Sequence, residues 1–386
     1  MIEKYYSGVI EQIYNRIGKE TRNIVMANYS NDFSIENLEV IRRYQSNEDN
    51  VFFAYSEFSY NTLVGAYEPF LDIICNMHRH FIGGSFDDFQ RECGVYYLHR
   101  QVLNSYYETG ECFREETVLL NEVAYEQRRM TKAIVDMLKR LSEVRPLMIV
   151  INRFQMASKS SIETIKYLID NPCTNIGIVL GVNVQVKGTD STVEVWDRIV
   201  ESLEDRSAIY YIGSAGQQKN HIRDTSDDEL YITTNFEQSI QEASNIMEFL
   251  DYEQARRGCR IIEHKIKFED AWIDEKSLRR FYLIYARTSV LLGEMSKAIE
   301  LTNEYKALIP ESDSEHYFSI YYFMKGTCYM YQGKLEKAEG CAKKAYDYAL
   351  LADDELLEFK SELLSVMIKM SGWYNIFFCV QDIPVS

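Results

Sequence analysis

The sequence predicts an α/β domain with a parallel β-sheet, followed by an all-α domain of helical repeats. Short apolar segments alternate with helical patterns over residues 1–215. A polar stretch, Gly213 to Asp228, then interrupts this alternation. From residue 236 to residue 386 no strand pattern remains, and small residues recur at the spacings of paired helices. We therefore expect domains at 1–215 and 236–386, joined by a linker at 216–235.

Five apolar segments of the first domain are candidate strands: Asn23–Met26, Val51–Tyr55, Leu147–Ile151, Ile176–Val182 and Ala208–Ile212. Several are continuously apolar rather than alternating, which is typical of parallel strands covered by helices on both faces. Between them lie helical patterns over Ile35–Tyr44, Pro69–Phe81, Glu115–Val144 and Ser160–Ile169. Strands that alternate with helices predict an α/β architecture with a parallel sheet.

The repeat prediction depends on small residues that let two antiparallel helices approach closely. In the clearest unit these are Gly326, Gly333, Ala338, Ala342 and Ala345. The pattern is the helix–turn–helix of tetratricopeptide repeats, with Gly333 at the turn. Gly293 and Gly372 are predicted at equivalent turns, about 40 residues away on either side, against ~34 in the standard repeat. Further equivalent positions are Ala286, Ala298 and Pro310, and Ala255 is read as the mark of an earlier, degenerate unit. An unrelated helical bundle is the alternative.

The last apolar segment, Trp373–Phe378, reads as the beginning of a further helix. Repeats bury their faces only against neighbours, so a solenoid normally ends in a polar cap. We therefore expect either a fragment of a longer chain or an interaction at this end. That interaction would be self-association or a protein partner, through Trp373, Tyr374, Phe377 and Phe378.

Composition excludes several classes of function. Lys and Arg number 42 and Asp and Glu 59, which gives a formal net charge of −17 and disfavours direct nucleic-acid binding. The N-terminus lacks the apolar core of a signal peptide, and the longest apolar segment, Pro146–Ile151, is far too short to cross a bilayer. Eight scattered cysteines without a C-x-x-C pair are typical of reduced thiols. The sequence predicts a soluble cytoplasmic protein without membrane contact.

One constellation has the residue types of a zinc site: Cys75, His78 and His80, with Cys93 and His99 downstream. His78 and His80 are two residues apart, however, and would point away from each other on a helix. We therefore predict no metal site and interpret this segment as the end of a helix.

The sharpest local motif follows the candidate strand that ends at Ile151. Gln155, Ala157 and Ser161 come next at fixed offsets and lead into a helix. This segment resembles the Walker B region of STAND-type P-loop ATPases, the AAA-like modules of large bacterial transcription activators and of proteins fused to adenylate cyclase domains. The resemblance covers about residues 20–212 and includes Ala66–Phe70, which is similar to a segment after the second strand in that family. It implies a P-loop-like fold, and repeats are usual in the family's C-terminal half.

The same resemblance shows that the charged residues of the nucleotide site have been replaced. The Walker B strand of the family ends in two acidic residues that serve Mg²⁺ and the attacking water, but Asn152 and Arg153 stand there, and Ser158 replaces a later Asp. The phosphate-binding loop aligns with residues 27–34, where the positions of interest are Ser30, Asp32, Phe33 and Ser34. Glycines are missing, Phe33 replaces the lysine, and only Ser34 matches. Without glycine and lysine, the loop cannot cradle phosphates or balance their charge.

The resemblance thus implies a pseudo-ATPase with no catalytic residue and no cofactor. We expect a non-catalytic regulatory or scaffold protein that mediates protein–protein interaction in signal transduction or transcription regulation. One alternative is a switch or ATPase that binds ATP, if only weakly, through an altered site. Another is a fragment of a transcription activator without its DNA-binding domain. Only about residues 213–236 separate the two domains, so the helical lid and winged-helix subdomain of the family are expected to be absent.

Overall fold

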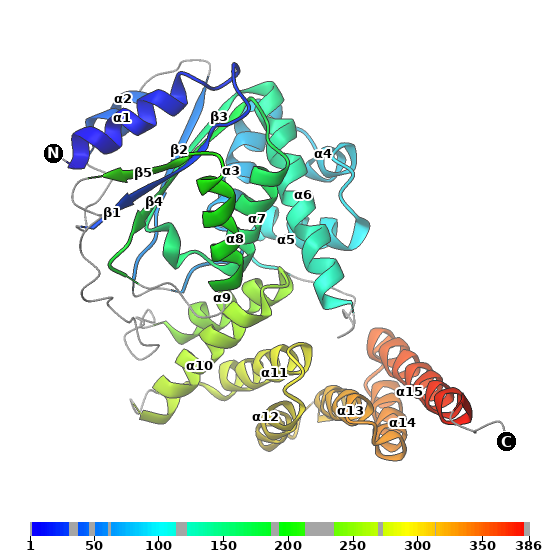
Figure 1. Cartoon of the computed structure of the whole chain (residues 1–386). Coiled ribbons are helices and arrows are strands. Elements are labelled where there is room, and N and C mark those ends of the chain that lie inside the picture. Colours follow the sequence, from blue (N-terminus) through cyan, green and yellow to red (C-terminus); the bar gives the residue numbers. More distant parts are fainter. Residues whose placement is uncertain are drawn as a thin grey trace. The chain divides into compact units, whose positions relative to one another are not determined.

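The computed structural model contains two compact units, Met1–Ile261 and Ile262–Ser386 (Figure 1). Each unit has its own buried hydrophobic cluster. The structure describes residues 2–30, 38–45, 51–60, 63–112, 122–186, 193–212, 235–268, 273–312 and 314–381. Within these ranges, the side chains of residues 193–194 and 372–381 are not described.

The first unit contains a five-stranded parallel sheet in the order β2-β3-β4-β1-β5. Its strands are β1 (Ile24–Tyr29), β2 (Phe52–Glu57), β3 (Leu147–Asn152), β4 (Ile176–Asn183) and β5 (Ile209–Ile212). Every residue of β3 and β4 is buried, as their continuously apolar sequences require. The predicted α/β architecture with a parallel sheet is confirmed.

Helices cover both faces of this sheet (Figure 1). One face carries α1 (Ile2–Tyr14) and α2 (Glu39–Gln45). The other face carries α3 (Phe70–Met77), α6 (Val123–Val144), α7 (Lys159–Asp170) and α8 (Val193–Glu204). The connecting elements are η1 (His78–Ile82), α4 (Phe86–Glu92), α5 (Tyr97–Thr109) and η2 (Phe154–Met156). None of the described helices combines the length and apolarity needed to cross a bilayer.

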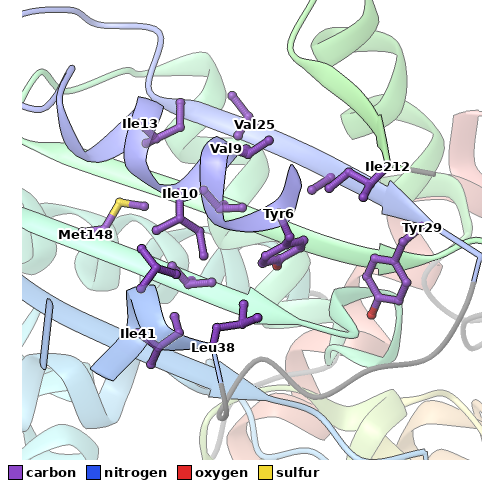
Figure 2. Close-up of a cluster of buried hydrophobic side chains, with 14 of the residues drawn as sticks. Tyr6, Val9, Ile10, Ile13, Val25, Tyr29, Leu38, Ile41, Met148 and Ile212 are labelled. Carbon is purple, nitrogen blue, oxygen red and sulfur yellow. The ribbon is translucent and has the colours of Figure 1, made fainter. Parts of the chain in front are cut away.

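Helix α1 is an element that the sequence analysis did not predict. Tyr6, Ile10 and Ile13, spaced by four and three residues, are completely buried on its inner face. They belong to the cluster that includes Val25 of β1 and Met148 of β3 (Figure 2). Burying a large apolar side chain stabilises a fold by about 1.5–3 kcal/mol, so α1 is an integral layer of the unit.

The first compact unit extends beyond the boundary expected from sequence. It includes α9 (Phe236–Glu248) and α10 (Tyr252–Phe268) as far as Ile261. Gln254 Nε2 donates a hydrogen bond of 3.0 Å to the carbonyl oxygen of Val64, and Gln127 Nε2 donates one of 2.6 Å to that of Leu250. The expected linker, apart from its last residue, lies outside the described residues.

Asp251 joins the beginnings of α7 and α10. Its carboxylate accepts hydrogen bonds from the backbone N–H groups of Ser160, at 3.0 Å, and Gln254, at 3.4 Å. Burial raises the pKa of Asp251 above its ordinary value of 3.8, although these N–H donors oppose the rise. The folded chain therefore binds this proton more tightly than the unfolded chain does.

This raised pKa predicts a pH-dependent loss of stability. Tighter proton binding in the folded state makes the free energy of unfolding fall as pH rises from 3.8 through the folded-state pKa. The variant Asp251→Asn has no such proton, so its stability relative to the wild type should improve as pH rises through this window. Urea unfolding of both proteins at several pH values measures the difference, with the exposed Asp205→Asn as control. A difference that is the same at every pH would contradict the prediction.

The second unit is all helical. Its main elements are α11 (Glu275–Leu291), α12 (Met295–Ala307), α13 (Ser314–Tyr331), α14 (Leu335–Leu351) and α15 (Glu355–Gln381). Two short turns join α11 to α12 and α13 to α14, and they contain Gly293 and Gly333 with φ of 77° and 71°. This is the left-handed region that favours glycine, so both predicted turns are confirmed. The five alanines of the repeat pattern that lie in this unit are fully or almost fully buried: Ala286, Ala298, Ala338, Ala342 and Ala345.

The turn predicted at Gly372 is wrong. Helix α15 runs without interruption from Glu355 to Gln381, so Gly372 lies within it. The segment that begins at Trp373 continues this helix and does not begin another. A glycine inside a helix costs only about 0.5–1 kcal/mol relative to alanine, which is too little to end a helix by itself. Ala255 is fully buried and lies within the first compact unit.

Candidate functional site

The five strands are parallel, so their carboxyl ends meet at one edge of the sheet, which we call the carboxyl edge. Tyr29, Glu57, Asn152 and Asn183 are the last residues of β1, β2, β3 and β4 there. Neighbouring strands β1 and β4 lead into helices on opposite faces, α2 and α8 (Figure 1). Open α/β sheets bind ligands at such a switch point. The carboxyl edge is therefore the candidate functional site.

Asn152 occupies the first of the two acidic positions expected from the resemblance. Its side chain is fully buried, and its Oδ1 accepts a hydrogen bond of 2.6 Å from the hydroxyl of Tyr29. This bond joins the ends of β3 and β1 across the intervening strand β4. An amide oxygen carries no charge, and this one is already used within the protein. Asn152 therefore lacks the negative charge with which a Walker B carboxylate holds Mg²⁺.

Arg153 occupies the second acidic position, and its side chain turns toward β2. The guanidinium lies 2.9 Å from Glu57 Oε1 and donates to the carbonyl oxygen of Phe58 at 3.3 Å. It also lies over the ring of Tyr60, 4.8 Å from the ring centroid. Both members of the ion pair are largely buried, with 19% and 16% of the side chain exposed. The pair is neutral as a whole, and the cation is already matched by a carboxylate.

A glycine in β4 brings the network into contact with α1. A Cβ added at Gly181 would lie 2.7 Å from Asn152 Oδ1 and closer still to the hydroxyl of Tyr6. Burial raises the pKa of Tyr6, and the nearby Glu57 carboxylate raises it further. The phenol is therefore neutral at physiological pH. Only a residue without a side chain fits between these two polar groups.

The other motif residues hold the edge together. Gln155 Oε1 accepts a hydrogen bond of 3.3 Å from the backbone N–H of Asn183, which ties the segment after β3 to the end of β4. Asn183 Nδ2 in turn donates to the Tyr60 hydroxyl at 3.1 Å. Asn183 Oδ1 accepts from the backbone N–H of Gln185 at 3.0 Å. Gln155 thus has a structural role in this protein.

Two segments that carry the family resemblance, residues 66–70 and the beginning of α7, are joined by hydrogen bonds. The backbone N–H of Tyr67 donates to Ser160 Oγ at 2.9 Å, and the Ser161 hydroxyl donates to the carbonyl oxygen of Glu68 at 2.7 Å. Ser158, which replaces the expected Asp, caps α7 by accepting from the backbone N–H of Ser161. These residues are far apart in sequence, and their spacing alone does not predict the contact.

The structure places only part of the predicted site. Ser30 is buried directly after β1, while Asp32, Phe33 and Ser34 lie outside the described residues. The predicted interaction residues Trp373, Tyr374, Phe377 and Phe378 belong to α15, but their side chains are not described. Sequence analysis missed Tyr6, Tyr29, Glu57 and Gly181. Tyr29 and Glu57 could have been noticed as polar residues at the ends of two apolar strands that share one edge.

The histidines considered for zinc have other partners. His80 Nδ1 lies 2.7 Å from the carbonyl oxygen of Asn76, and His78 Nδ1 lies 3.1 Å from the hydroxyl of Tyr107. His99 Nε2 lies 3.0 Å from a carboxylate oxygen of Glu126. Among the described residues, no group of three or more His, Cys, Asp or Glu side chains is arranged to hold a metal ion.

The carboxyl edge thus combines a neutral amide, an internal ion pair and a buried phenol around the switch point. Asn152 is bonded to Tyr29, and the positive charge of Arg153 is balanced by the carboxylate of Glu57. Compared with known protein families and with curated proteins, the sequence matches no family model and no curated protein.

Proposed function

We propose that this chain is a non-catalytic regulatory or scaffold protein, built on a degenerate STAND-type ATPase module and tetratricopeptide-like repeats. The observation that carries the proposal is the bonding of Asn152 and Arg153. One is bonded to Tyr29 and the other is paired with Glu57. Both residues are thus bonded within the protein, at the two positions where such an ATPase needs free carboxylates.

The topology of the sheet supports the ATPase ancestry. In a P-loop ATPase, the segment after the first strand and the end of the acidic strand must reach the same phosphate groups. Here β1 and β3 end at the same edge, separated only by β4, and the Tyr29–Asn152 hydrogen bond spans that separation. This topology supports the proposed ancestry, and Asn152 and Arg153 stand where the acidic pair of such an ATPase is expected.

The second unit supports a role in protein–protein interaction. Helical hairpins with buried alanines and glycine turns build elongated surfaces in repeat proteins, and such surfaces commonly bind other proteins. We propose that these helices mediate interactions in signal transduction or transcription regulation. The negative net charge of the chain favours protein partners over nucleic acid.

The proposal predicts no magnesium-dependent ATP turnover and no tight binding of Mg-ATP. Asn152 is neutral and Arg153 is a cation paired with Glu57, so neither can replace the missing carboxylates. Isothermal titration with Mg-ATP should give no micromolar affinity, and a phosphate-release assay should show no turnover above that of the Asn152→Ala and Ser34→Ala variants. Micromolar binding, or turnover that these substitutions abolish, would contradict the proposal.

A further inference from the structure

Helix α15 has two apolar faces, of which only one is buried. Leu364 and Ile368 belong to the core cluster of the second unit, together with Met330, Ala338 and Ala342. On the opposite face, five apolar side chains are 44–63% exposed: Leu356, Phe359, Leu363, Val366 and Met370. We call these five residues the α15 stripe. An exposed apolar row of this length on a helix usually marks an interaction site.

The spacing of the α15 stripe indicates what kind of surface would cover it. Successive members are separated by three, four, three and four residues, which is the heptad spacing of a and d positions. On an α-helix, these positions fall within an arc of about 80°. In the sequence, the same spacing continues at Trp373 and Phe377. A narrow stripe with this period is complementary to another helix that carries the same spacing.

Two charged residues beside the stripe indicate the identity and direction of that helix. Glu362 and Lys369 are exposed and directly precede Leu363 and Met370, so they lie on the same side of the stripe. Consider two copies of α15 that run antiparallel about a two-fold axis between Leu364 and Ser365. Leu363 then lies opposite Val366 of the second copy, and Phe359 opposite Met370.

In this register, Glu362 of each copy lies beside Lys369 of the other, so the symmetric pair contains two opposite-charge contacts. A parallel pair would instead place Glu362 beside Met367 and Glu355 beside Lys360. The contact between Glu362 and Lys369 is therefore specific to the antiparallel direction. The net charge of −17 opposes non-specific self-association of the chain.

We infer that α15 forms an antiparallel helix pair with a second copy of this chain, through the α15 stripe and the Glu362–Lys369 contacts. The inference rests on the proposed scaffold function and names one partner for it. It does not depend on the chemistry of the carboxyl edge, so the two can fail separately.

Sedimentation of the full chain over a wide concentration range tests the stripe. The wild type should reach a dimer, and Phe359→Ser combined with Leu363→Ser should weaken the dimer at least about tenfold, because both residues lie near its centre. Tyr5→Ser is the matched control, since Tyr5 is an aromatic residue of α1 with similar exposure, 60% against 63% for Phe359. Circular dichroism shows whether each variant is folded.

Charge reversal tests the direction. Glu362→Lys should weaken the dimer about threefold to tenfold, because two attractive contacts become repulsive. Adding Lys369→Glu restores opposite charges across the antiparallel pair, so the double variant should recover the wild-type affinity. In a parallel pair Glu362 and Lys369 are not neighbours, so adding Lys369→Glu would not restore the affinity lost in Glu362→Lys.

A wild type that stays monomeric, or a dimer that is unaffected by the stripe substitutions, would overturn the inference and leave the scaffold function to other surfaces. A dimer that needs the stripe but ignores the charge reversals would overturn the antiparallel register. Mg-ATP turnover, by contrast, would remove the proposed function and leave the dimer unaffected.

Discussion

Replacing Ala338 by leucine is expected to lower the free energy of unfolding of the second unit by about 1–3 kcal/mol, the usual cost of overpacking a well-filled core. Ala338 is completely buried on α14, where this helix crosses α13 at Gly326. A Cβ added at Gly326 would lie only 3.4 Å from the carbonyl oxygen of Ala338 and 3.2 Å from the Cβ of Cys341. The backbones approach so closely that three additional carbons at Ala338 must push the helices apart.

Hydrogen exchange measures this effect separately in each unit. Amides of α13, α14 and α15 should lose protection in Ala338→Leu, whereas amides of β3 and β4 should keep theirs. The matched control is Glu339→Leu, because residue 339 is exposed on the same helix and both residues are good helix formers. Equal protection of wild type and variant throughout the second unit would show that the two helices are not packed closely at Ala338.

The sheet could be predicted from sequence because its signal is local. The segments 147–151 and 176–182 are continuously apolar, and this happens mainly where a strand is covered on both faces. The turns at Gly293 and Gly333 were also predictable, since a left-handed turn favours glycine. Gly372 shows the limit of this reasoning. It continues the spacing, but a glycine also tolerates an ordinary helical conformation, and spacing cannot distinguish the two.

The candidate site was less predictable because its bonds join distant strands. Asn152 and Arg153 could be located at the end of a strand from sequence alone. Their pairing with Tyr29 and Glu57 could not be predicted, since it depends on the strand order β2-β3-β4-β1-β5. Nothing in any single segment specifies that β4 lies between β3 and β1. The long-range pairing of the strands therefore determines which side chains at the carboxyl edge bond to one another.

Gly181→Ala is expected to destabilise the first unit by about 1–3 kcal/mol, although it adds a single methyl group. The new Cβ would overlap the hydroxyl of Tyr6 and lie 2.7 Å from Asn152 Oδ1. Both obstacles are fully buried, and Asn152 is held by its hydrogen bond from Tyr29, so neither can move away without loss. Gly8→Ala in α1 is the matched control, because a Cβ there meets nothing within 4 Å. It should be neutral or stabilising, as alanine is favoured over glycine in helices.

A double-mutant cycle with Tyr6→Phe identifies the cause of this destabilisation. Removing the hydroxyl of Tyr6 removes the nearer obstacle, so Gly181→Ala should cost less in the Tyr6→Phe background than in the wild type. A coupling free energy of at least about 0.5 kcal/mol is expected, since the two residues are in contact. Chemical unfolding of the four proteins measures it. If the two substitutions were simply additive, the close approach of Tyr6 to Gly181 of β4 would not explain the requirement for glycine. If coupling is found, the contact between the Tyr6 hydroxyl and the added methyl group accounts for part of the cost of Gly181→Ala.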